Sequence, residues 1–122
     1  MLTGVHALIF TPDADAVRAF FRDVLGLGGV DAGGGWPIFR LPPAELGIHP
    51  VEPGQTGHQE LYLMCDNLDQ TMHDLKSRGV EFPKPVSDEG WGLVTWIRLP
   101  GVGGEIALYE PRHPTAIGVA AD

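Results

Sequence analysis

Apolar residues recur at helical spacing in two segments of the chain. In residues 13–26 the apolar face consists of Val17, Phe20, Phe21, Val24 and Leu25, which recur three and four positions apart. Asp13 stands where a helix N-cap belongs, and Gly26 stands where a helix ends. In residues 66–79 the apolar face consists of Leu68, Met72 and Leu75, and Gly79 is the stop. The pattern predicts two amphipathic helices.

Shorter segments around each helix alternate apolar and polar residues, which predicts strands. One strand precedes each helix, at residues 5–10 and 60–66. Three more follow each helix, at residues 27–32, 36–41 and 45–49 in the first half and at residues 80–86, 93–99 and 105–110 in the second. When Asp13 is aligned with Asp66, Gly26 falls on Gly79 without a gap. A β-α-β-β-β unit therefore occurs twice, as an internal duplication.

This duplication predicts a single domain over residues 1–111, with modules at about 2–51 and 58–111. Residues 112–122 form a C-terminal tail that we expect to be irregular, and either mobile or clasped to a partner. A chain of 122 residues with an apolar share of 43% can build a packed core without disulfides.

The net charge and the single cysteine limit the kinds of partner and the cellular compartment that we expect for this protein. The net charge of −8 excludes nucleic acid as a partner, because a phosphate backbone requires clustered basic residues. The acidity mildly favours cationic ligands, or it simply keeps the protein soluble. Cys65 is the single cysteine and cannot pair within the chain, which favours a reducing compartment. The sequence has no signal peptide and no membrane-spanning stretch, so we expect a cytoplasmic protein without a membrane partner.

Three segments carry a family resemblance. They read VHALIFTPDADAVRAFFRDVLGL, LYLMCDNLDQTMHDLKSRGVEF and GGEIALYEP. In order and spacing they resemble the opening, the repeat and the closing strand of the vicinal oxygen chelate superfamily, which holds glyoxalases, bleomycin-resistance proteins and extradiol dioxygenases. The resemblance covers about residues 2–111 and implies an α+β fold, in which two tandem β-α-β-β-β modules form half-barrel sheets around a cavity.

Strand parity predicts which side chains face that cavity. Alternate residues of a strand point to opposite faces, so one set packs under the helices and the other lines the cavity. The expected lining consists of His6, Leu8, Phe10, Gly47, His49, Glu60, Tyr62, Met64, Ala107 and Tyr109, with Phe39 and Trp96 as walls. Trp91, between Gly90 and Gly92, is either a mobile aromatic flap or a turn with a partly buried anchor. The expected substrate-binding residues are Phe10, Phe39, His49, Tyr62, Met64, Trp91, Trp96 and Tyr109.

The resemblance implies a divalent metal held by His and Glu side chains from the first and last strand of each half. Two of the four positions carry His6 and Glu60, whereas the other two carry Gly47 and Ala107, which have no ligating side chain. The set is therefore incomplete, although His49 could join the two remaining ligands, with His58 as a weaker substitute. Without a metal, His6 is a neutral histidine in a polar cavity and Glu60 an exposed carboxylate. His73 and His113 are expected to be solvated, and Cys65 to be a core residue.

The favoured functional hypothesis is a metal-independent protein that binds a small organic molecule in the cavity between the modules. One alternative is a metal-free lyase or isomerase in which Glu60 or His6 acts as general base or acid. Another is a metal-dependent lyase or dioxygenase. The glycine-rich segments 33–35 and 101–104 lack the strand-to-helix context of a nucleotide-binding loop. The resemblance and the open strand edges also predict a homodimer, swapped or unswapped.

Overall fold

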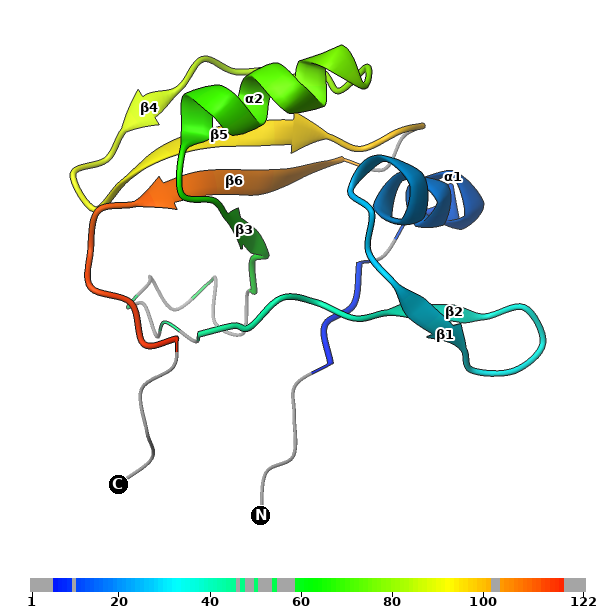
Figure 1. Cartoon of the computed structure of the whole chain (residues 1–122). Coiled ribbons are helices and arrows are strands. Elements are labelled where there is room, and N and C mark those ends of the chain that lie inside the picture. Colours follow the sequence, from blue (N-terminus) through cyan, green and yellow to red (C-terminus); the bar gives the residue numbers. More distant parts are fainter. Residues whose placement is uncertain are drawn as a thin grey trace, which may run out of the picture.

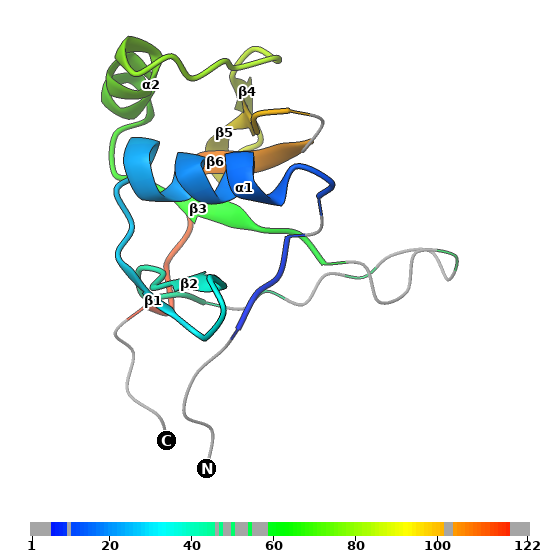
Figure 2. The same cartoon turned by 90° about the vertical axis from the view of Figure 1, so that its right-hand side faces the viewer.

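The two helices and the strands of the second half together form one layered domain. The computed structural model describes residues 6–9, 11–45, 47, 50, 54, 59–101 and 104–117. α2 lies along one face of a four-stranded sheet, α1 lies beside one end of that sheet, and a two-stranded hairpin lies on the side away from α2 (Figures 1 and 2). This is the α+β architecture that the sequence predicts. No helix among these residues is long and apolar enough to cross a membrane.

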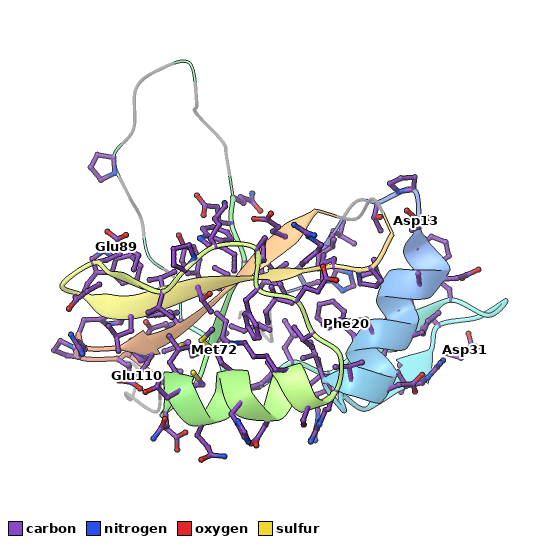
Figure 3. The ribbon with its side chains drawn as sticks, turned by 90° about the horizontal axis from the view of Figure 1, so that it is seen from above. Asp13, Phe20, Asp31, Met72, Glu89 and Glu110 are labelled. Atoms are coloured by element: carbon purple, nitrogen blue, oxygen red, sulfur yellow. The ribbon has the colours of Figure 1, made fainter. Side chains whose placement is uncertain are left out.

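The two helices occupy the segments that the apolar periodicity predicts. The first is α1 (Ala14–Ala19), which continues as the π-helical segment η1 (Phe20–Val24), and the second is α2 (Leu68–Ser77). The Asn67 side chain caps α2 by accepting a hydrogen bond from the Gln70 amide at 3.0 Å. Glu110 lies beside the start of α2 and accepts a hydrogen bond from the Leu68 amide at 2.9 Å (Figure 3). Two backbone amides in the first turn of α2, which have no partner within the helix, are thereby hydrogen-bonded.

The main sheet has the strand order β3-β6-β5-β4. Its strands are β3 (Tyr62–Met64), β4 (Ser87–Asp88), β5 (Gly92–Arg98) and β6 (Glu105–Pro111). β3 runs parallel to β6, whereas β6 pairs with β5 and β5 with β4 in antiparallel fashion. The separate hairpin consists of β1 (Gly29–Asp31) and β2 (Pro37–Phe39).

The hydrophobic core lies between the helices and one face of this sheet. Its buried residues are Val17, Phe20, Phe21, Leu68, Leu75, Val80, Ile97, Leu99, Ile106 and Leu108. Phe20 and Met72 lie between the helices and the sheet (Figure 3). Leu63 and Cys65 of the β3 segment also pack on the core. The alternation expected for the second half is therefore confirmed, and Tyr62, Ala107 and Tyr109 fall on the opposite face.

Two of the predicted strands are wrong. Residues 80–86 form no strand, because Pro83 and Pro85 lack the amide protons that a ladder requires. A single backbone hydrogen bond, from the Arg98 amide to the Glu81 carbonyl at 3.0 Å, ties this segment to the edge of β5.

The strand predicted at residues 5–10 is also missing where the structure describes it. Residues 6–9 are irregular, and they pair with no strand in the described part of the chain. Leu8 is 65% exposed, so this segment buries little apolar surface on the domain. The strand predicted at residues 45–49 lies largely outside the described residues, because positions 46, 48 and 49 are not among them.

Candidate functional site

Four aromatic side chains gather on the sheet face opposite the helices. This aromatic cluster consists of Tyr62 in β3, Trp96 in β5, Tyr109 in β6 and Trp91 in the turn before β5. The Tyr62 ring centroid lies 6.2 Å from that of Trp91 and 6.1 Å from that of Trp96. It also lies 5.7 Å from the Tyr109 centroid, which in turn is 5.5 Å from Trp91. Three of these pairs are edge-to-face, the arrangement that the quadrupoles of aromatic rings favour.

A hollow of about 280 Å³ lies beside the aromatic cluster. It is lined by Tyr62, Lys84, Pro85, Ser87, Glu89, Trp91, Val94 and Trp96. Glu89 lies at the end of the sheet far from α1 (Figure 3). The volume lies just below the range of typical small-molecule sites, roughly 300–1,000 Å³. Aromatic walls with a few polar groups are the composition that such sites share.

The aromatic cluster depends on the small side chain of Ala107. In register, Ala107 of β6 lies between Tyr62 of β3 and Trp96 of β5. Adjacent strands are about 4.8 Å apart, so two strands flanking a third are about 10 Å apart. The rings of Tyr62 and Trp96 nevertheless approach to 6.1 Å between centroids. They therefore lean toward each other over Ala107, which is fully buried beneath them.

Trp91 is held in a tight turn. The turn forms at Gly90, whose φ is 81°, a value that favours glycine. A side chain at Gly92 would lie 2.9 Å from the Tyr109 ring, so the close approach of the backbone requires glycine there as well. The Trp91 carbonyl accepts a hydrogen bond from the Arg112 amide at 2.9 Å. Trp91 is 44% exposed in this turn, and the mobile flap and the partly buried anchor both stay predictions.

The tail residue His113 belongs to the surroundings of the aromatic cluster. Its ring stacks on Tyr109 with centroids 5.9 Å apart, and its Nε2 lies 3.0 Å from the Tyr109 hydroxyl. His113 Nδ1 lies 2.7 Å from the Pro114 carbonyl oxygen, which can only accept. Nδ1 therefore carries a proton, and in the neutral imidazole Nε2 accepts from the Tyr109 hydroxyl. The expectation of a solvated His113 is wrong, because stacking on Tyr109 half-buries the ring.

Glu45 anchors the tail to the first half of the chain. Its Oε1 accepts a hydrogen bond from the Ala116 amide at 2.7 Å, and its Oε2 lies 3.9 Å from His113 Nε2. Arg112 forms an ion pair with Asp88 at 3.1 Å. The described part of the tail is irregular, as predicted, and these contacts fix it beside the aromatic cluster.

Burial raises the pKa of both tyrosines above the ordinary tyrosine value. For Tyr62 the next contributions are the hydrogen bond and the negative charge of Glu60. For Tyr109 the negative charge of Glu45 adds to the effect of burial. Each cause disfavours the tyrosinate form, so both hydroxyl groups stay protonated donors at neutral pH.

The structure brings together only some of the residues predicted to form the site. Tyr62, Trp91, Trp96 and Tyr109 form the aromatic cluster, and Glu60 reaches it through the Tyr62 hydroxyl. Met64 is half-buried on the same strand but does not line the hollow.

Other predicted residues lie elsewhere. Phe39 packs on the core with its ring centroid 6.1 Å from that of Phe21, so it is not a wall of the hollow. His6 is exposed in the irregular segment 6–9. Phe10 and His49 lie outside the described residues.

The described residues do not fit a divalent metal. The resemblance assigns one ligand to the β6 position of Ala107, which is buried beneath the rings of Tyr62 and Trp96. Its counterpart, Gly47, is exposed. Within the described ranges no three His, Cys, Asp or Glu side chains are placed to hold an ion, and His49 and His58 fall outside those ranges. The resemblance suggests a metal, but the sheet presents an aromatic surface at this position.

Sequence reasoning missed three charged residues near the site, namely Glu45, Lys84 and Glu89. Lys84 lies in a segment between two prolines that was predicted as a strand, and Glu89 lies in the turn before Trp91. A charged residue beside a glycine-flanked tryptophan is a weak signal. The role of Glu45 depends on a contact 71 residues away and had no local signal.

The raised tyrosine pKa values give a direct spectroscopic prediction. The chain has two tyrosines, and both belong to the aromatic cluster, so tyrosinate absorbance reports on this site alone. We expect both to ionise at a pH above the ordinary tyrosine value in the native protein, and at the ordinary value in denaturant. The pKa of each tyrosine is higher in the folded protein than in the unfolded chain. The contribution of the tyrosines to the free energy of unfolding is therefore fully present below the ordinary tyrosine pKa, and it is lost as the pH rises through the raised pKa of the folded protein. Native tyrosines that titrate at the ordinary value would contradict the burial of both hydroxyl groups.

Comparison with known proteins places the fold. A family model described as "Glyoxalase/Bleomycin resistance protein/Dioxygenase superfamily" matches residues 4–111. A superfamily member from Sphaerobacter thermophilus is 24% identical, covers 89% of this chain and 98% of its own, and has a TM-score of 0.59. A lactoylglutathione lyase from Agrobacterium tumefaciens is 18% identical, with coverages of 88% and 92% and a TM-score of 0.62.

An antibiotic-binding protein from Streptomyces, TnmS3, is also similar. It is 21% identical, with coverages of 91% and 99% and a TM-score of 0.59. No match was found among curated proteins. At these identities the structural neighbours establish the fold alone, whereas the family match spans nearly all of the sheet and both helices. The chain belongs to the glyoxalase/bleomycin resistance protein/dioxygenase superfamily.

Proposed function

We propose that this protein binds a small organic molecule with a flat ring in the hollow beside the aromatic cluster. The observation that carries the proposal is the convergence of Tyr62, Trp91 and Trp96 on one hollow of about 280 Å³. Aromatic faces and edges of this kind bind flat rings with geometric preference, beyond what burial alone contributes. A volume of this size accommodates a fragment of one or two fused rings rather than a polymer.

A few polar groups at the hollow are placed to orient the ligand. Ser87 and Glu89 are among the lining residues. The Tyr62 hydroxyl is kept protonated by burial and by Glu60, so it is a neutral polar group at the same wall. Small-molecule sites commonly combine an apolar lining with such sparse polar groups, which fix orientation and specificity.

Binding is compatible with the comparisons, which include a lyase as well as antibiotic-related proteins and by themselves favour neither binding nor a reaction. The fold is shared with an antibiotic-binding protein from Streptomyces and with a fosfomycin resistance protein, FosX, from Listeria monocytogenes. Catalysis by Glu60 and His6 has less support, because His6 lies exposed in the irregular segment 6–9. The proposal is therefore a ligand-binding protein without a complete metal site.

A titration with a named flat probe tests the proposal. We expect quinoline, at a mildly alkaline pH where it is neutral, to bind the purified protein in isothermal titration calorimetry. Trp96→Ala should weaken this binding by about three- to tenfold, because it removes one ring face from the hollow. Trp36→Ala is the matched control, because Trp36 is an exposed tryptophan of the hairpin segment with its ring under Arg18.

Equal losses in Trp96→Ala and Trp36→Ala would place the binding outside the hollow and overturn the proposal. Wild-type protein that binds neither quinoline nor related flat heteroaromatic probes would also count against it.

We also propose that the protein pairs as a homodimer through the first half of the chain. Leu8 and Val30 both belong to the first half of the chain and are 65% and 68% exposed, and exposed large aliphatic side chains are candidates for an interface. The β1–β2 hairpin also pairs with no further strand among the described residues, so its edges are open.

Light scattering tests the homodimer. We expect a mass of twice 13.1 kDa for the wild type, and a shift toward the single-chain mass for Val30→Glu, since burial of a charge at the interface is costly. A wild-type mass of one chain at micromolar concentration would contradict this assembly.

A further inference from the structure

One cation already occupies the aromatic wall of the hollow. Lys84 lines the hollow, and its Nζ lies 4.8 Å from the centroid of the Trp96 ring. The same ammonium group forms an ion pair with Glu105 Oε1 at 3.1 Å. A tryptophan face and a carboxylate are both groups that attract a positive charge. The two groups together form a cation site whose occupant comes from the protein itself.

The backbone of Lys84 is fixed, so its side chain is directed to this site by the fold. Pro83 and Pro85 flank it, and their rings restrict the backbone on both sides. The hydroxyl group of Thr95, which is fully buried, donates a hydrogen bond to the Lys84 carbonyl at 3.4 Å. This contact ties Lys84 to β5, the strand that also carries Trp96.

The ammonium group itself is held weakly. The Lys84 side chain is 56% exposed and that of Glu105 is 30% exposed. Ion pairs and cation–π contacts at exposed positions contribute little, because water screens them and the long side chain loses entropy. A ligand can therefore displace Lys84 from Trp96 without disturbing the core.

The charges around the hollow favour a cation in its place. When Lys84 moves away, the carboxylate of Glu105 loses its partner, and Glu89 remains among the lining residues. The nearby guanidinium groups are engaged elsewhere: Arg98 pairs with Glu81 at 3.0 Å and Arg112 with Asp88 at 3.1 Å. The net charge of −8 adds a negative electrostatic field, which also attracts cations.

We propose that the ligand of the hollow is a flat organic cation, and that Lys84 acts as an internal competitor that occupies the cation site on Trp96 and Glu105 when no ligand is bound. This inference rests on the proposed function and adds the charge of the ligand. It assigns Lys84 a role in affinity, since each bound cation must displace the ammonium group first.

The affinity of Lys84→Met for a cationic probe, measured by isothermal titration calorimetry, tests whether Lys84 competes with the ligand. Methionine keeps most of the length of the side chain but removes its charge. We expect the variant to bind 1-methylquinolinium about three- to tenfold more tightly than the wild type. Its affinity for neutral quinoline should change by less than about twofold, because no charge is competing.

Lys84→Arg returns a cation and should restore the wild-type affinity for 1-methylquinolinium. Adding Glu105→Gln to Lys84→Met should remove most of the gain.

The outcomes separate this inference from the function on which it rests. Unchanged or weaker binding of 1-methylquinolinium by Lys84→Met overturns the competitor, even if quinoline still binds in a Trp96-dependent manner. An equal gain for quinoline also overturns it, since Lys84 would then be a steric obstacle only. If neither probe binds the wild type or Lys84→Met, both the inference and the proposed function are wrong.

Discussion

The aromatic surface depends on the contact between Tyr62 and Trp96 across β6. These residues lie on strands that flank β6, and their ring centroids lie 6.1 Å apart with the small residue Ala107 between them in register. A longer side chain at this position would stand between the rings and hold them apart. The remaining members of the aromatic cluster are arranged around this pair, since Tyr62 also contacts Trp91 and Tyr109. The small side chain of Ala107 thus leaves room for two of the rings that line the hollow to approach each other.

The same position links the missing metal ligand to the aromatic hollow. A carboxylate at position 107 would offer a metal ligand and would also separate the two rings. Ala107 does the opposite, because it offers no ligand atom and lets the rings approach. In this chain a metal site and an aromatic site at position 107 are therefore alternatives. The side chain at one central β6 position determines which of them the sheet presents.

Local patterns predicted the parts of the fold that depend on local physics. The apolar spacing of residues 13–26 and 66–79 predicted both helices, and Gly26 and Gly79 end them with φ of 71° and 87°. The alternation of side chains along the strands correctly divided the sheet of the second half into a core face and an aromatic face. It did so because β5 and β6 are long enough to hold one register. The segment 80–86 failed because two prolines outweighed its alternation.

The site was less predictable, because its contacts join residues that are distant in the chain. The sequence indicated that Tyr62, Trp96 and Tyr109 share a face, but the role of Ala107 required the register of three strands. Nothing local indicated that Lys84 would reach Trp96, or that His113 would stack on Tyr109. Phe39 was misplaced because the separate hairpin β1–β2 turns it toward Phe21.

The most direct test of this account is the affinity of Ala107→Leu for quinoline, measured by calorimetry on protein shown to be folded. Leucine should force the rings of Tyr62 and Trp96 apart and weaken binding by about tenfold, whereas Ala107→Gly should bind as the wild type does. An unchanged affinity in Ala107→Leu would contradict the claim that the contact across Ala107 forms the binding surface.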